Sequence, residues 1–186
     1  MNKSKNNKIS EMIRVNHAGE MGAKVIYDGQ ILALKLKKDF DTLKIVEHMK
    51  SQENKHFDFF DEEMKKEQIR PTLMQPIWKV GGFALGFLTA IINKKSAMTC
   101  TTAVEEVIDK HYQQQIEDIN HEEKNSNKNN KQLQNLKEQI IKFREEEIEH
   151  KEIAYNNNAN QFFAHKPMTS FIKFTTNLAI TISKKI

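Results

Sequence analysis

Four glutamates fall on the apolar faces of predicted helices in this chain of 186 residues. They are Glu20, Glu53, Glu105 and Glu147. Burying an unpaired carboxylate is strongly unfavourable unless a cation or hydrogen-bond donors compensate its charge. A fold that turns four such groups inward must therefore supply them with a partner.

The 3.6-residue spacing of apolar side chains predicts four amphipathic helices joined by short connections. Their expected ranges are Ser10–Lys37, a second helix capped by Asp39 and ending before Pro71, a third from Ser96 as a candidate cap to Glu123, and a fourth around Leu133–Ala154. The polar run KNSNKNN at residues 124–130 is typical of a surface loop. Only six Gly and three Pro occur, which favours long helices over a β fold.

Each half of the chain repeats one motif: a lone inward Glu on one helix and a Glu-x-x-His on the next. The two Glu-x-x-His pairs are Glu53/His56 and Glu147/His150, each with both side chains one turn apart on one face. Two equivalent helical hairpins would form a pseudo-twofold bundle, and each hairpin would contribute half of one site.

Four carboxylates and two imidazoles match the known ligand pattern of di-iron carboxylate bundles. Their combined charge of about −4 balances two Fe(II) ions, and oxygen and imidazole donors suit iron or manganese. Glu-x-x-His also arises by chance in a Glu-rich chain. The prediction of a metal site therefore depends on the placement of all six residues on apolar faces. The single Cys100 makes no zinc site and is expected to be a small buried core residue.

Several neighbours of these residues have two readings. His17 is either a group behind the ligands or a packed side chain, and Gly19 and Gly22 either allow close helix packing or leave room beside the metals. Tyr112 lies two turns after Glu105 and suits either core packing or a redox or proton relay. The remaining glutamates near the motifs are expected to form a solvated face: Glu106, Glu145, Glu146 and Glu149.

Residues 76–92, PIWKVGGFALGFLTAII, contain one charge, Lys79. Their length is marginal for crossing a bilayer, and Gly81, Gly82 and Gly86 are expected to loosen a helix there. The segment therefore suits either a buried connection or contact with the membrane interface. The segment after Pro167 is amphipathic or apolar, and it either packs on the bundle or touches lipid.

The net charge of +4 comes from basic residues interspersed with acidic ones. This pattern argues against a nucleic-acid partner and is compatible with binding to an anionic membrane surface.

The first ten residues lack the apolar run of a secretory signal and are too short for a full transit peptide.

Several stretches resemble the demethoxyubiquinone hydroxylases of ubiquinone biosynthesis. The resemblance covers nearly everything from Ile13 onward, and Arg14–Ala23 and Arg70–Ala90 are its most specific parts. The stretches are RVNHAGEMGA (14–23), IYDGQ (26–30), QENKH (52–56), RPTLMQPIWKVGGFALGFLTA (70–90), AVEEVIDKHYQQQI (103–116) and FREEEIEHKE (143–152).

The resemblance implies one ferritin-like domain over residues 1–186, with 76–92 as a membrane-interfacial connection between the two helical hairpins. It implies two iron ions per chain on the ligands Glu20, Glu53, His56, Glu105, Glu147 and His150, with Glu53 and Glu147 bridging. His111 and Tyr112 match a pair associated with electron delivery, and Lys110 stands where some relatives carry a further His.

The implied reaction is hydroxylation, with O2, of the ring of a demethoxylated ubiquinol. NADH or a reductase would donate electrons, and other ubiquinone-biosynthesis proteins would be partners. The expected location is the cytoplasmic face of a bacterial membrane, peripherally attached.

Two other functions fit the same pattern. One is a ferritin- or rubrerythrin-like protein that oxidises iron or reduces peroxide. The other is a helical membrane-associated scaffold without metal.

Overall fold

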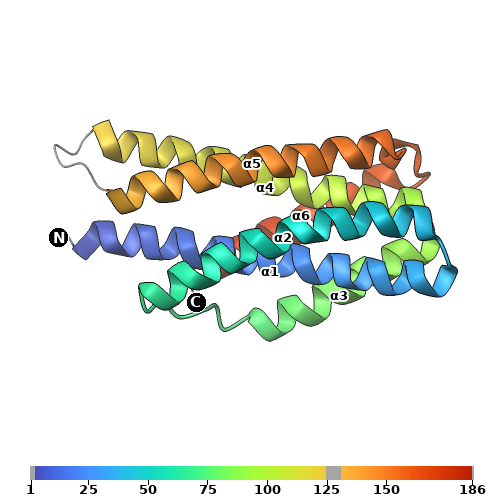
Figure 1. Cartoon of the computed structure of the whole chain (residues 1–186), viewed down its shortest axis with the longest axis horizontal. Coiled ribbons are helices and arrows are strands. Elements are labelled where there is room, and N and C mark those ends of the chain that lie inside the picture. Colours follow the sequence, from blue (N-terminus) through green and yellow to red (C-terminus); the bar gives the residue numbers. More distant parts are fainter. Residues whose placement is uncertain (1–2, 125–130, 186) are drawn as a thin grey trace.

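The computed structural model describes residues 3–124 and 131–185, with side chains from residue 8 onward, and these ranges form helices joined by short connections (Figure 1). The helices are α1 (Lys3–Lys37), α2 (Phe40–Lys66), α3 (Gln75–Ile92), α4 (Lys94–Lys124), α5 (Lys131–Asn156) and α6 (His165–Lys185), with a 3-10 turn at Ala159–Gln161. The predicted all-α bundle with additional helical segments is confirmed. The predicted loop at residues 124–130 lies outside the described residues except for Lys124, which ends α4.

The helix ends follow local chemistry. Asp39 caps α2 as predicted, because its Oδ1 accepts from the Thr42 backbone N–H at 3.1 Å. The predicted cap at Ser96 is wrong: Asn93 Oδ1 accepts from the Ser96 N–H at 2.9 Å, and Ser96 is buried in the first turn. Helix α1 begins seven residues before the predicted Ser10, since no Pro or Gly interrupts the preceding residues.

The helices run side by side along the long axis of the molecule (Figure 1). Helices α1 and α2 form one hairpin, α4 and α5 form the other, and α3 connects them while packing along α1. Helix α6 returns along α4 and α1.

Helix α3 meets α1 through glycine. A Cβ at Gly86 would lie 1.9 Å from the Ile26 carbonyl oxygen, and a Cβ at Gly29 would lie 2.1 Å from the Phe83 carbonyl oxygen. No side chain fits in either place, so the two backbones touch. The expectation that Gly86 loosens α3 is therefore corrected, because this glycine allows α3 to pack closely on the bundle.

Two apolar clusters fill the interior. One contains Ile13, Phe60, Ile119, Ile140 and Phe143, and the other contains Leu34, Val46, Met49, Met98 and Ala154. Cys100 is fully buried in the first cluster, as predicted. Along every helix of the two hairpins, the inward glutamates lie between residues of the two clusters, at the middle of the bundle.

Candidate metal centre

The six predicted side chains meet in the middle of the bundle. Each is at most 2% exposed: Glu20, Glu53, His56, Glu105, Glu147 and His150. Two overlapping groups bring one potential donor atom from each residue within 4.8 Å of the others. The first is Glu20, Glu53, His56 and Glu147, and the second is Glu53, Glu105, Glu147 and His150. Glu53 and Glu147 belong to both groups.

Both imidazoles turn Nδ1 toward the carboxylates. His56 Nδ1 lies 3.2 Å from Glu147 Oε1 and 3.4 Å from Glu20 Oε2. His150 Nδ1 lies 3.1 Å from Glu147 Oε2 and 3.2 Å from Glu53 Oε1. Donor atoms about 2 Å from one cation, at roughly right angles, are about 3 Å apart, so these separations fit a shared ion.

Several of the carboxylate oxygens lack a hydrogen-bond donor among the described residues. These buried atoms are Glu20 Oε2, both oxygens of Glu53, and Glu105 Oε2. An orphaned buried oxygen is costly in a protein interior, and a divalent cation would satisfy it. The donor set therefore fits a metal centre.

The electrostatics of the cluster are those of crowded buried acids. Burial, followed by the charge of Glu147, raises the pKa of Glu53 and of Glu105 well above the usual range. Burial also acts to raise the pKa of Glu147, but hydrogen bonds with His150 and His56 outweigh it and lower that pKa. The two imidazoles thus favour the ionised form of Glu147, one of the two carboxylates common to both groups.

Two tyrosines reach across the bundle to the unshared carboxylates. Tyr112 on α4 donates to Glu20 on α1, and Tyr27 on α1 donates to Glu105 on α4 at 2.9 Å. Burial raises the pKa of both phenols well above 10, so both remain donors. The sequence singles out Tyr112 for core packing or a relay, but it assigns no role to Tyr27.

His111 lies beside Tyr112, with ring centroids 6.4 Å apart. Its Nε2 is 2.9 Å from the Gln115 amide, which forms two reciprocal 2.9 Å hydrogen bonds with Asn16. Burial, followed by the charge of Lys184, lowers the pKa of His111 to about 4 and keeps the ring neutral. The predicted electron relay through His111 and Tyr112 stays a prediction.

The structure gives the surroundings of His17 and Gly22, for which the sequence allowed two interpretations. His17 belongs to neither metal group; its Nε2 lies 3.4 Å from Asp61 Oδ1, and its ring packs 4.8 Å from Phe57. A Cβ at Gly22 would meet nothing within 4 Å, so open space adjoins this glycine. That this space serves the metals stays a prediction.

The predicted solvated face is only partly correct. Glu145 and Glu149 are exposed, as expected. Glu106 is half-buried and binds Lys173 and the Tyr155 hydroxyl. Glu146 was wrongly assigned to this face, because its Oε2 lies 2.9 Å from His56 Nε2.

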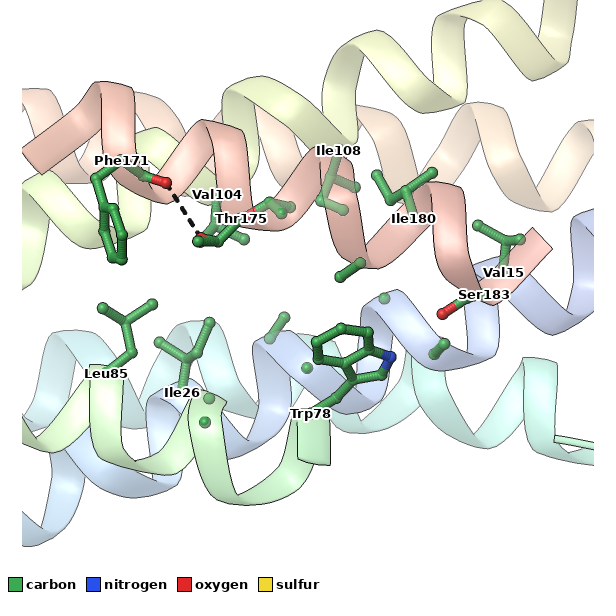
Figure 2. A pocket seen from close by; sticks show the side chains of 18 residues that line it. Val15, Ile26, Trp78, Leu85, Val104, Ile108, Phe171, Thr175, Ile180 and Ser183 are labelled. Atoms are coloured by element: carbon green, nitrogen blue, oxygen red, sulfur yellow. Dashed lines mark hydrogen bonds between the residues drawn. The ribbon is translucent and has the colours of Figure 1, made fainter. Parts of the chain in front are cut away.

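An apolar cavity of about 290 Å³ lies between α1, α3, α4 and α6 (Figure 2). Its walls include Ile26 on α1, Trp78 and Leu85 on α3, Ile108 on α4 and Phe171 on α6. Gly19 and Val104 also line it, and they directly precede Glu20 and Glu105 in the chain. The cavity thus lies against the helix segments that carry the two unshared carboxylates.

Residues 7–183 match the family described as Ubiquinone biosynthesis protein COQ7. The chain is 39% identical over 178 residues to the 3-demethoxyubiquinol 3-hydroxylase of Rhodospirillum rubrum, covering 96% of this chain and 78% of that protein. It is 37% identical to the mitochondrial NADPH-dependent 3-demethoxyubiquinone 3-hydroxylases of Dictyostelium discoideum and Homo sapiens, each over 96% of this chain and 77% and 78% of the relative. The bundle, its buried glutamate–histidine centre and these matches together show that the chain belongs to the COQ7 family of demethoxyubiquinone hydroxylases.

Proposed function

We propose that this protein is a di-iron monooxygenase that hydroxylates the ring of a demethoxylated ubiquinol with O2 in ubiquinone biosynthesis. The observation that carries the proposal is the pair of buried donor groups that share Glu53 and Glu147. Each group would hold one iron ion, with Glu53 and Glu147 as bridges and Glu20, His56, Glu105 and His150 as terminal ligands. Two divalent ions also balance the charge of the four carboxylates.

The chemistry that a bound pair of iron ions supplies is reductive activation of O2. In the balanced reaction, a ring C–H becomes C–OH, the second oxygen atom leaves as water, and two electrons and two protons are consumed. A reduced nicotinamide nucleotide is the proposed electron source, used directly or through a reductase, since two of the similar proteins are named NADPH-dependent. Tyr112 and the neutral His111 beside it lie on the proposed path of electrons or protons to Glu20.

The apolar cavity is the proposed substrate site. Its volume of about 290 Å³ is at the small end of ligand sites, as a quinol ring would require. Figure 2 shows α3 and α6 on opposite sides of the cavity, with Trp78 and Leu85 facing Phe171 and Ile180 across it. The walls would give the ring an apolar contact surface, and two of the lining residues, Gly19 and Val104, directly precede Glu20 and Glu105.

The isoprenoid tail of such a substrate belongs in a bilayer, and α3 and α6 carry exposed apolar side chains. The most exposed of these are Ile77, Val80 and Leu88 on α3 and Phe171 and Phe174 on α6. Helix α3 is long and apolar enough to cross a membrane, with a mean hydropathy of 1.3 over residues 75–92, which is weak evidence by itself. Its backbone contact with α1 favours a helix that stays on the bundle and lies in the interface.

We therefore propose peripheral attachment through α3 and α6, with residues 76–92 as the interfacial connection and the cytoplasmic face of a bacterial membrane as the location. Co-sedimentation with vesicles of phosphatidylglycerol and phosphatidylethanolamine tests this. Replacing Val80 and Phe174 with Ser should release the protein from the vesicles, whereas the exposed Glu145→Gln should not.

The deciding experiment uses anaerobically iron-loaded protein, a demethoxylated ubiquinol analogue, a reductant and 18O2, with mass spectrometry of the product. One 18O atom in the ring is expected. Two bound iron ions with ferrous oxidation or peroxide reduction, but without ring hydroxylation, would instead support the ferritin- or rubrerythrin-like alternative. No bound iron would support the scaffold alternative.

A further inference from the structure

Each histidine of the centre has a second contact on its outer side. His56 Nε2 lies 2.9 Å from Glu146 Oε2, and His150 Nε2 lies 2.9 Å from Gln52 Oε1. Both contacts cross between α2 and α5. Each ring is therefore held at both nitrogens, with Nδ1 toward the carboxylates and Nε2 toward an outer partner.

The identity of the outer partners determines where the Nε2 proton lies. An ionised carboxylate only accepts, so His56 must donate its Nε2–H to Glu146. The Gln52 amide is oriented by Glu149, which accepts from Gln52 Nε2 at 3.3 Å. Gln52 Oε1 consequently faces His150 and accepts from its Nε2–H. Both rings keep a proton at Nε2 and present Nδ1 as the donor atom for a cation.

The two outer partners occupy equivalent positions in the internal repeat. Gln52 directly precedes Glu53, and Glu146 directly precedes Glu147. Each reaches the histidine of the opposite hairpin. The surrounding ligands are matched as well, since each metal group contains three carboxylates and one imidazole, and each unshared carboxylate accepts from a tyrosine. The charge of the outer partner differs between the halves: a carboxylate lies behind His56, and a neutral amide lies behind His150.

We propose that Glu146 and Gln52 are positioning residues that make the two metal positions inequivalent, so that the position beside His56 binds a divalent cation first and more tightly. A carboxylate that accepts the Nε2–H increases the electron density at Nδ1 more than a neutral amide does, and it adds negative charge behind the cation. Glu146 is largely buried, with 21% of its side chain exposed, so solvent screens this effect only in part. The inference rests on the proposed two-metal function.

Cobalt(II) tests the inference without turnover. It is oxidised by air far less readily than Fe(II), and its visible absorption reports the ligands that surround it. Metal-free protein is titrated with Co(II) to obtain two binding constants. Crystals grown with one equivalent of Co(II) then show by anomalous diffraction which position fills first. We expect first occupancy beside His56 and affinities that differ by at least about 10-fold.

The variants exchange the two partners. Glu146→Gln should reduce the affinity ratio about 10-fold. Gln52→Glu is made together with Glu149→Gln, so that the new carboxylate does not face another one, and should raise the affinity beside His150. All three changes together should reverse the order of filling. Glu145→Gln, which removes an exposed neighbouring charge, is the control and should leave the ratio unchanged. Glu149→Gln alone is the reference for the double variant, because Glu149 orients the Gln52 amide.

Equal affinities, first filling beside His150, or a ratio insensitive to Glu146→Gln would overturn this inference while leaving the two-metal function intact. Failure of the unaltered protein to bind two cations would overturn both.

Discussion

The Tyr27 hydroxyl on α1 donates a 2.9 Å hydrogen bond to Glu105 Oε1 on α4. Tyr112 on α4 donates to Glu20 on α1 in the same way. Each tyrosine follows the glutamate of its own helix by seven residues and serves the glutamate of the other helix. The two hairpins are thus joined by reciprocal contacts around the centre.

Replacing Tyr27 with Phe should weaken metal binding while preserving the bundle. The variant removes the donor to Glu105 Oε1 in a fully buried place, and loss of such an outer contact typically lowers metal affinity about 10- to 100-fold. Titration of the metal-free protein with Co(II) measures this. Tyr155→Phe removes the hydroxyl that binds Glu106, away from the centre, and serves as the matched control. Equal Co(II) affinity in Tyr27→Phe and Tyr155→Phe would show that the hydroxyl of Tyr27 does not support the centre.

Removing one of the shared carboxylates should stabilise the metal-free protein and, at the same time, abolish its stabilisation by metal. Burial, followed by the charge of Glu147, raises the pKa of Glu53, so the ionised Glu53 destabilises the metal-free fold. Glu53→Gln should therefore stabilise the metal-free protein by about 1 to 4 kcal/mol. It should also abolish the gain of about 3 kcal/mol per iron site that the unaltered protein obtains from Fe(II) at 100 times the dissociation constant of that site.

Urea denaturation with and without anaerobic Fe(II) measures both effects. Glu145→Gln, which neutralises an exposed glutamate, should change neither. An Fe(II)-dependent gain that persists in Glu53→Gln would remove Glu53 from the ligand set.

The glycine contact between α1 and α3 can be tested by adding one methyl group. Gly86→Ala would place its Cβ 1.9 Å from the Ile26 carbonyl oxygen, and backbone cannot yield as a side chain does. We expect the free energy of unfolding to fall by about 1 to 3 kcal/mol. Gly81→Ala adds the same methyl group on the same helix where nothing lies within 4 Å, and it should be neutral or stabilising by up to about 1 kcal/mol. Similar stabilities of the two variants would contradict the close contact of these helices.

Periodicity could predict the fold class and the six inward residues, because a side chain on an apolar helix face is buried in almost any packing of that helix. Contacts between helices depend on how the helices rotate and slide against one another, and one helix's pattern does not contain that information. Glu146 illustrates this: it borders the buried face of α5, and only the position of α2 brings His56 to it. Tyr27 did have a signal, since Glu-x6-Tyr occurs in both halves of the internal repeat.

The cavity itself can be closed from α1. Gly22 lines it, and a Cβ at this position would meet nothing within 4 Å. Gly22→Ala should stabilise the helix by up to about 1 kcal/mol and leave the cavity open. Gly22→Leu should project a branched side chain into the cavity and weaken binding of a quinol analogue at least about 10-fold, which corresponds to about 1.4 kcal/mol. Because Gly22 belongs to neither donor group, both variants should bind two iron ions per chain. Fluorescence titration with the analogue and iron analysis of the same samples separate the two effects. Wild-type affinity for the analogue in a folded, iron-loaded Gly22→Leu variant would place the substrate outside this cavity.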